Sequence, residues 1–255
     1  MEKPKSNRVI LRLDETLSTN AELKRLQKEN PLPEYSMVMT EFQTAGRGQA
    51  GNSWYSGKGN NILLSFLLYP HSVKAKDQFI ISQIVSLAIK RVLDNFIEDV
   101  TIKWPNDIYW NDKKIAGILI ENSLIGQHID YTIVGVGLNV NEKEFPSSLP
   151  NPVSLREITG ERADREILLT LLQVEFLRLY QAMERGEITP IEREYMKQLY
   201  HSDSPHWFTD KNGRFKATIK TVLSSGYLIL STYPNKEERM YAFKEVSFEI
   251  DEKRG

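Results

Sequence analysis

Hydrophobic and polar residues alternate in short runs over the first 140 residues, and this period of two predicts β-strands. The predicted strands cover residues 9–13, 37–42, 61–69, 101–103, 108–110, 114–121 and 131–139. Two segments between them have helical spacing instead. Thr19-Asn20-Ala21-Glu22 has the pattern of a capping box, which predicts a helix with Leu23 and Leu26 turned inward. Residues 77–96 repeat apolar side chains three and four positions apart, as on one face of an amphipathic helix.

The pattern changes twice in the second half of the chain. Ser154-Leu155-Arg156-Glu157 is a second capping box, followed by helical patterns over residues 165–183 and 190–200. After residue 204, alternation returns in short runs around Gly213, Gly226 and Pro234. Short alternating runs separated by turn residues are typical of a small antiparallel barrel. We therefore predict two domains, residues 1–204 and 205–255.

Composition narrows the classes of protein without choosing one. The 255 residues are 40% hydrophobic and 26% charged, as in ordinary globular proteins. No apolar run approaches the ~20 residues of a membrane span, and the N-terminal residues do not have the apolar core of a signal peptide. These features, with the absence of cysteine, predict a cytoplasmic protein that does not contact a membrane.

Charge and histidine content argue against two kinds of site. The formal net charge of −1, without a basic block, does not predict a DNA-binding surface. The four histidines do not have the spacing of a zinc site. A magnesium ion held by carboxylate and amide oxygens beside a nucleotide stays open.

A long glycine-rich loop follows the predicted strand at 37–42. Gly46, Gly48 and Gly51 fit G-x-G-x-x-G, but no helix pattern begins after them, so a dinucleotide fingerprint is excluded by context. The loop carries Arg47 and Trp54, and backbone N–H groups beside a guanidinium suit an anion. The alternative is a plain surface connection. Long unstructured connections are uncommon in compact domains unless functional or disordered, which favours a binding loop.

A second polar segment, Lys103-Trp104-Pro105-Asn106-Asp107, lies between two predicted strands. Proline restricts both itself and the residue before it, so the segment can hold Asn106 and Asp107 in fixed positions. A strand end with Asn-Asp as turn residues is an equally good interpretation of these residues. Lys114 follows on the next strand, at a predicted hairpin whose tip is alternatively a solvated pair of lysines.

Glycines also interrupt two of the predicted strands. Gly117 stands inside one strand, and Gly135 and Gly137 lie on one face of another. Interior glycines often mark close approach of a ligand, so this strip has room for a flat group. Asn139 ends the second strand, and Gln43 ends the strand before the loop. Ser18, Thr19 and Asn20 combine a predicted helix cap with hydroxyl and amide groups that can face a pocket.

The order and spacing of these segments resemble those of biotin protein ligases. The resemblance covers roughly residues 8–200, and the C-terminal barrel is similar to the small SH3-like domain of that family. It implies an α+β fold, with a mixed, mainly antiparallel sheet and flanking helices as in class II synthetases. It also implies activation of biotin by ATP to biotinyl-5′-AMP, followed by transfer to a lysine of a biotin carboxyl carrier domain.

The resemblance assigns roles to individual residues. Lys114 and Arg47 would be catalytic and would contact both biotin and nucleotide. The biotin site would further include Ser18, Thr19, Asn20, Gln43, Gly46, Gly117, Gly135 and Gly137. The nucleotide site would further include Gly48, Trp54, Lys103, Asn106, Asp107 and Asn139, with Asp107 and Asn139 also available to Mg²⁺.

The chain departs from the family pattern at two places. Gln49 and Ala50 stand where many members have arginine after the second loop glycine, and one cation fewer is expected to loosen retention of the adenylate. Bifunctional members carry an N-terminal helix-turn-helix domain, whereas the first predicted strand here begins near Val9. The expectation is therefore a ligase without operator binding.

Three alternatives remain beside biotin ligation. A lipoate or octanoate ligase would use the same fold, although the Lys-Trp-Pro-Asn-Asp segment disfavours it. A catalytically dead biotin sensor is disfavoured by intact Arg47 and Lys114. A nucleic-acid-binding protein is disfavoured by the neutral charge. The resemblance is compatible with a monomer or a homodimer.

Overall fold

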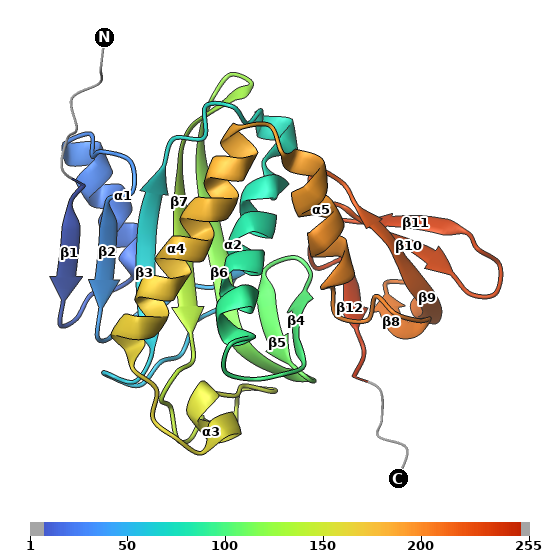
Figure 1. Ribbon diagram of the computed structural model, residues 1–255. Coiled ribbons are helices and arrows are strands. Elements are labelled where there is room, and N and C mark those ends of the chain that lie inside the picture. Colours follow the sequence, from blue (N-terminus) through green and yellow to red (C-terminus); the bar gives the residue numbers. More distant parts are fainter. Residues whose placement is uncertain (1–7, 251–255) are drawn as a thin grey trace.

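The computed structural model describes residues 8–250, and a seven-stranded sheet forms the larger part of it (Figure 1). Its strands follow one another in space as β1-β2-β3-β7-β6-β5-β4, with β1 and β2 parallel and all other neighbours antiparallel. The predicted mixed, mainly antiparallel sheet is confirmed. The strands are β1 (Ile10–Leu13), β2 (Met37–Thr40), β3 (Ile62–Leu68), β4 (Val100–Lys103), β5 (Asp107–Trp110), β6 (Lys113–Ile125) and β7 (His128–Leu138).

Helices cover the two faces of this sheet unequally (Figure 1). On one face, α2 (Phe79–Leu93) and α4 (Arg165–Glu184) pack against each other, and α5 (Ile188–Lys197) packs against both. On the other face, α1 (Thr19–Glu29) packs mainly on β2, β3 and β7, and its first turn also reaches β6 through Asn20. Among residues 8–250, no helix covers the rest of that face. A short helix, α3 (Leu155–Thr159), precedes α4.

Side chains along each strand point alternately to the two faces of the sheet, so one sheet contributes to two hydrophobic cores. Met37 and Met39 belong to the large core on the α2–α4 side, whereas Val38 between them packs with Leu23 of α1. In β7, Val134, Val136 and Leu138 join the large core. Because side chains alternate across a strand, Gly135 and Gly137 face the side of α1.

The two predicted capping boxes have different outcomes. At α3, the Ser154 hydroxyl accepts from Glu157 N at 3.1 Å and the Glu157 carboxylate accepts from Ser154 N, so this box is confirmed. At α1, the predicted box is wrong, because the N-cap is Ser18 and its side chain makes no capping hydrogen bond. Glu22 pairs instead with Arg25, at 2.7 Å, and Thr19 turns toward the sheet.

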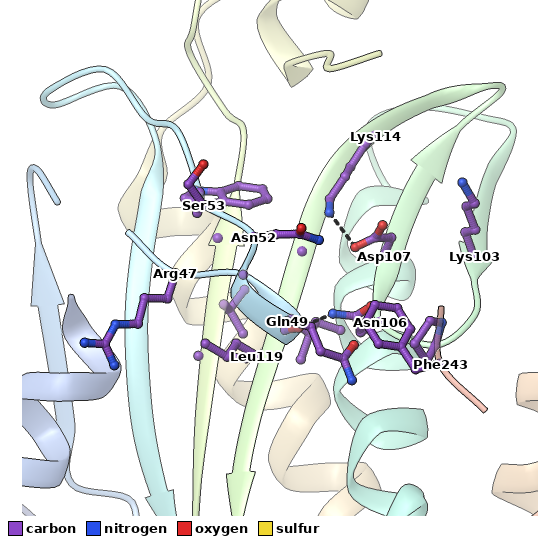
Figure 2. Close-up of a pocket in the computed structure, with 18 of the residues that line it drawn as sticks. Arg47, Gln49, Asn52, Ser53, Lys103, Asn106, Asp107, Lys114, Leu119 and Phe243 are labelled. Carbon is purple, nitrogen blue, oxygen red and sulfur yellow. Dashed lines mark hydrogen bonds and ion pairs between the residues drawn. The ribbon is translucent and has the colours of Figure 1, made fainter. Parts of the chain in front are cut away.

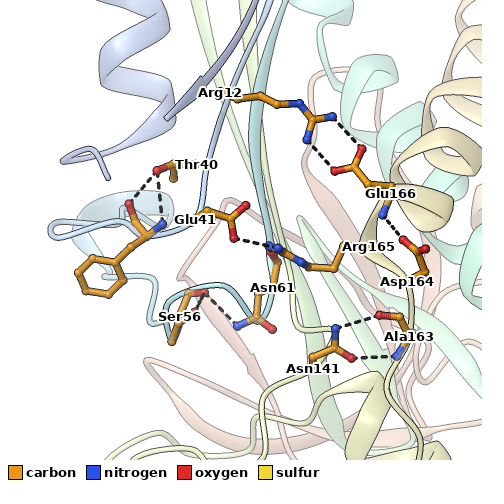
Figure 3. A network of polar contacts seen from close by, with 12 residues as sticks. Arg12, Thr40, Glu41, Ser56, Asn61, Asn141, Ala163, Asp164, Arg165 and Glu166 are labelled. Carbon is orange, nitrogen blue, oxygen red and sulfur yellow. Dashed lines mark hydrogen bonds and ion pairs between the residues drawn. The ribbon is translucent and has the colours of Figure 1, made fainter. Parts of the chain in front are cut away.

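A polar network joins the start of α4 to the edge of the sheet (Figure 3). Arg12 of β1 makes a bidentate pair with Glu166, with N–O distances of 2.6 and 2.7 Å. Arg165 lies 2.8 Å from Glu41 and donates to the Asn61 carbonyl oxygen at 3.0 Å. These contacts align α4 along β1 to β3 at the end where the glycine loop leaves the sheet.

The C-terminal residues form a second, five-stranded antiparallel sheet in the order β11-β10-β9-β8-β12. Among residues 8–250, β11 and β12 are its edges and do not pair with each other, so the sheet is open and closure into an SH3-like barrel stays a prediction. The division into two domains also stays a prediction, because a single hydrophobic cluster includes residues of both sheets. The strands are β8 (His206–Asp210), β9 (Gly213–Val222), β10 (Leu228–Thr232), β11 (Glu238–Tyr241) and β12 (Val246–Phe248).

Within residues 8–250, no helix combines the length and apolar character needed to cross a membrane.

Candidate active site

A cavity of about 430 Å³ opens on the face of the large sheet that α1 leaves uncovered. The glycine loop, the start of α1, strands β4 to β7 and the C-terminal sheet all contribute to its walls. Most of the predicted site residues meet here, although they come from distant parts of the chain. They are Ser18, Thr19, Asn20, Gln43, Arg47, Gly48, Trp54, Lys103, Asn106, Asp107, Lys114, Gly117, Gly135 and Gly137.

Lys114 and Asp107 form an ion pair inside this cavity (Figure 2). Lys114 Nζ lies 2.6 Å from Asp107 Oδ1, and both side chains are mostly shielded from solvent. The pairing arises because β5 and β6 are adjacent antiparallel strands, with Tyr109 opposite Lys114. The backbone of Lys114 is also held on its other side, where its N–H donates to the Asn151 carbonyl oxygen at 2.8 Å. The sheet thus presents one ammonium group at a fixed place in the cavity.

Trp54 of the glycine loop lies flat against the interior glycines. A Cβ atom at Gly137 would be 2.4 Å from Trp54 Cε2, and one at Gly117 would be 2.7 Å from Trp54 Cζ3. The predicted room for a flat group is therefore present, and in this structure the indole of Trp54 occupies it. Lys114 Nζ is 5.5 Å from the Trp54 ring centroid. The indole N–H is buried against this strip and has no acceptor within residues 8–250.

The glycine loop is more ordered than a plain surface connection. Arg47 and Ser53 form an antiparallel bridge, Gly48 N donates to the Asn52 carbonyl oxygen at 2.7 Å, and Gln49–Gly51 is one 3₁₀ turn. Arg47 lines the cavity, but its exposed guanidinium points away from Asp107 and Lys114 in Figure 2. A phosphate beside Lys114 would be reached by Arg47 only after its side chain, or the loop, had moved.

The Lys-Trp-Pro-Asn-Asp segment is both a turn and part of the cavity, so the two interpretations of its sequence were compatible. The Trp104–Pro105 peptide bond is cis. The Asn106 side chain donates through Nδ2 to the Ile118 carbonyl oxygen at 2.6 Å. The backbone carbonyl oxygen of Asn106 accepts from Ile118 N at 2.9 Å. Lys103 Nζ donates to the Tyr109 hydroxyl at 2.8 Å. This segment is consequently fixed by contacts with β5 and β6.

Two predicted residues do not line the cavity. Gly46 is buried at the base of the loop, where a Cβ atom would be 2.5 Å from the Trp54 carbonyl oxygen. Asn139 is 3% exposed and donates to the Val153 carbonyl oxygen at 3.1 Å. Its amide therefore stabilises the segment at Val153, which pairs with the backbone of Lys114. The sequence could not show this, because Val153 is distant along the chain.

Other lining residues were missed from the sequence. Phe243, between β11 and β12, and Phe248 of β12 line the cavity, and Phe248 lies 5.8 Å from Lys103 Nζ, measured to the ring centroid. Nothing in their local sequence indicates a site, because only the packing of the second sheet brings them here. Ser65, fully buried behind Thr19, was visible only as the single polar residue in the run Ile62–Leu68.

Within residues 8–250, no three His, Asp or Glu side chains gather in a way that could hold a metal ion. Asp107 is the one carboxylate that lines the cavity in this described part of the chain. Magnesium in nucleotide sites commonly takes only one or two carboxylates and completes its shell with phosphate oxygens and water. The residues present fit an ion of that kind, brought in with the nucleotide.

Comparison with known proteins gives a consistent result. Residues 13–139 match the model of the biotin/lipoate A/B protein ligase family. The chain is 30% identical over 226 residues to the biotin–[acetyl-CoA-carboxylase] ligase of Paracoccus denitrificans, covering 86% of this chain and 92% of that protein. It is 30% identical over 210 residues to the bifunctional ligase/repressor BirA of Bacillus subtilis (strain 168), covering 80% of this chain and 63% of that protein.

The fold agrees with the same group. A structure of the biotin protein ligase from Aquifex aeolicus in complex with biotin and ATP superimposes with a TM-score of 0.78. It is 23% identical in sequence, and the match covers 94% of this chain and 98% of that one.

Proposed function

Because the chain belongs to the biotin/lipoate A/B protein ligase family, we propose that it is an ATP-dependent biotin protein ligase. It would adenylate biotin and then transfer the biotinyl group to a lysine of a biotin carboxyl carrier domain. The observation that carries the proposal is the single cavity in which Lys114, Asp107 and Trp54 meet the polar start of α1. One end thus offers hydrogen bonds to a small polar ring and the other offers positive charge to a carboxylate and phosphates.

In the first step, a biotin carboxylate oxygen attacks the α-phosphorus of ATP, the bond to the bridging oxygen breaks, and pyrophosphate leaves. Two anions must approach each other, so fixed cations lower the barrier. Lys114 would contact both groups, and Lys103 would add positive potential at the same wall, since both side chains line the cavity. Arg47 would join them by turning inward with the loop, in the manner of a closing lid.

In the second step, the acceptor amine attacks the carbonyl carbon of the mixed anhydride, and AMP leaves with the bonding electrons. The amine must be neutral to attack, and its nitrogen releases one proton to solvent as the amide forms. Trp54 and the 3₁₀ turn at Gln49–Gly51 cover one side of the cavity and would keep water from the anhydride. The C-terminal sheet, proposed as an SH3-like domain, would close another side through Phe243 and Phe248.

Magnesium would be held by Asp107 together with phosphate oxygens and water. When bound, it would neutralise phosphate charge. Asn139 is not proposed as a ligand of the metal or of the nucleotide, because its amide is buried and donates to a backbone carbonyl oxygen outside the cavity.

Mass spectrometry tests this proposal most directly. A biotin carboxyl carrier domain incubated with the protein, biotin, ATP and Mg²⁺ is expected to gain the mass of one biotinyl group, only when ATP is present. Lys114→Ala should slow the gain by about 10²–10³-fold, the usual cost of a preorganised group that stabilises charge. Lys113→Ala is the matched control, because Lys113 is exposed and does not line the cavity.

A second candidate, ligation of lipoate or octanoate, is distinguished in the same assay. The outcome that favours it is that the biotin carrier domain gains no mass with biotin while a lipoyl carrier domain gains mass with lipoate. In that case the family assignment would be correct, and biotin would be the wrong acid.

A further inference from the structure

Behind the start of α1 lies a buried chain of polar groups that the roles above do not use. Ser65 is 0% exposed, and its Oγ is 2.7 Å from Thr19 Oγ1 and 2.5 Å from Asn20 Oδ1. Asn20 Nδ2 in turn lies 2.9 Å from Glu121 Oε2. Thr19 and Asn20 line the cavity, whereas Ser65 and Glu121 stand behind them. The chain therefore connects the cavity wall to a carboxylate outside it.

The carboxylate determines which way the Asn20 amide points. An ionised carboxylate only accepts hydrogen bonds. Asn20 has two acceptors on the same side, Glu121 Oε2 and the Leu119 carbonyl oxygen at 3.3 Å, so its NH₂ group must face them. Its Oδ1 is then turned toward Ser65. Lys24 Nζ lies 3.5 Å from Glu121 Oε1, which leaves Oε2 to Asn20.

The number of available protons determines which group donates and which accepts in each remaining hydrogen bond. Asn20 Oδ1 carries no hydrogen, so the proton in its contact with Ser65 is that of the Ser65 hydroxyl. Ser65 has no second proton, and its contact with Thr19 therefore requires the Thr19 hydroxyl proton. Thr19 Oγ1 is left with lone pairs on the side of the cavity.

The neighbouring amide is oriented independently. Gln43 Oε1 accepts from Thr19 N at 2.9 Å, so Gln43 Nε2 is directed away from Thr19. The longer contact of 3.2 Å between Thr19 Oγ1 and Gln43 Oε1 does not need the hydroxyl proton, because Oε1 already has a donor. This end of the cavity thus presents an acceptor at Thr19 beside a donor at Gln43.

We propose that Ser65 and Glu121 are positioning residues that set the direction of hydrogen bonding at this end of the cavity. They select a ring with an N–H donor next to a carbonyl acceptor, which is the pattern of a cyclic urea. This inference rests on the proposed function, since the ring of biotin is a cyclic urea, and it adds two residues that do not themselves touch the ligand.

Calorimetric measurement of the affinities for two ligands tests the direction of hydrogen bonding from Asn20 through Ser65 to Thr19. The ligands are biotin and biotin methylated at a urea nitrogen, with each regioisomer measured separately. In Ser65→Ala, the Thr19 proton loses its acceptor and can turn toward the ligand N–H. Affinity for biotin should fall about three- to tenfold, as expected for one neutral hydrogen bond. Affinity for the regioisomer that lacks this N–H should stay within about twofold of the original protein.

Two further variants complete the design. Ser86→Ala removes another fully buried serine, in α2 and outside the cavity, and should leave both affinities unchanged. Glu121→Gln replaces a pure acceptor by a group that can also donate, so preference for biotin over the methylated ligand should fall about two- to fivefold. If Ser65→Ala does not fold, the Glu121→Gln measurement decides the matter.

The outcomes separate this inference from the function on which it rests. A purely structural role would weaken both ligands equally in Ser65→Ala, and that result would overturn the inference. An unchanged preference in Glu121→Gln would also count against it. If the unmodified protein does not bind biotin at all, the proposed function fails first.

Discussion

At the scale of single residues, Trp54 and the glycines beneath it are the most sensitive contact in the cavity. Gly137 lies in a strand paired on both sides, so its backbone cannot retreat from an added side chain. Gly137→Ala would therefore displace Trp54. Affinity for biotin and ATP together should fall about 10- to 100-fold, in line with overpacking of a close-packed site.

A double-mutant cycle tests the cause of that loss. In a Trp54→Ala background, the same Gly137→Ala change meets an empty strip and should cost little. Binding measured by calorimetry for the four proteins gives the coupling energy. Equal losses in both backgrounds would mean that Gly137 acts on the ligand or on the sheet and not through Trp54.

Gln49 gives a second prediction at this scale. It lies in the 3₁₀ turn of the loop and lines the cavity, where many family members place an arginine. Gln49→Arg would add one cation near the phosphate, and a charge-assisted hydrogen bond should slow escape of biotinyl-5′-AMP about tenfold. Trapping the released intermediate with hydroxylamine measures the escape rate. Gln49→Leu, which is of similar size and adds no charge, should not slow the escape. If Gln49→Arg released the intermediate as fast as the original protein, the prediction would be contradicted.

Single residues also show the limits of sequence interpretation. The cavity residues near turns and glycines were recognised because their types carry chemistry wherever they stand. Asn139 was assigned to the nucleotide site by the resemblance to biotin protein ligases, yet its amide donates to the Val153 carbonyl oxygen. Ser65 was passed over because one serine in an apolar strand has no distinguishing local feature. In both cases the deciding partner is distant in sequence, so only the fold identifies it.

At the scale of elements, the sequence predicted most strands and helices because hydrophobic period reflects burial, and burial is what the packed sheet imposes. The caps were less reliable. Ser154 has its expected partner three residues on, whereas the Thr19 hydroxyl contacts Ser65 of the underlying strand β3 instead of capping the helix. Local patterns predict an element well until a tertiary contact competes for the same side chain.

The contact between β1 and α4 gives a prediction of pH dependence. The hydrogen bonds from Arg12 lower the pKa of Glu166 below its ordinary value. A carboxyl with a lowered folded-state pKa stabilises the protein above its unfolded value of about 4.3, and this stabilisation is lost as pH falls through the folded value. Both side chains are more than half exposed, so the pair should contribute only about 0.2–1 kcal/mol.

Urea unfolding at two pH values measures this contribution. Glu166→Gln should lower the free energy of unfolding by that amount at pH 7, and this loss should shrink as pH falls through the folded-state pKa and the carboxyl becomes protonated in both states. The difference at pH 7 should also shrink in 1 M salt. Glu187→Gln is the control, since its bridge to Arg185 is similarly exposed but links residues two positions apart in the turn between α4 and α5. A pH-independent loss in Glu166→Gln would point to packing and not to the ion pair.

At the scale of the whole molecule, the cavity belongs to both sheets. Trp104, buried in the Lys-Trp-Pro-Asn-Asp segment, donates through Nε1 to the Gly226 carbonyl oxygen of the C-terminal sheet at 3.0 Å. Residues of β12 and of the connection between β11 and β12 line the cavity, whereas β11 itself does not. Ligand binding should therefore be felt in the second sheet, and unequally across it.

Amide hydrogen exchange, measured with and without biotin and a non-hydrolysable ATP analogue, tests this effect of ligand binding on the second sheet. Amides of β12 should exchange about tenfold more slowly when both ligands are bound, because the strand is at an edge and its opening is then linked to ligand release. Amides of β11, also at an edge, should change little and serve as the internal control. Equal protection of the two strands would show that ligands stabilise the second sheet as a whole. Absence of protection in both would show that the C-terminal sheet forms a wall the ligands do not use, and catalysis would then depend on the large sheet and its loop alone.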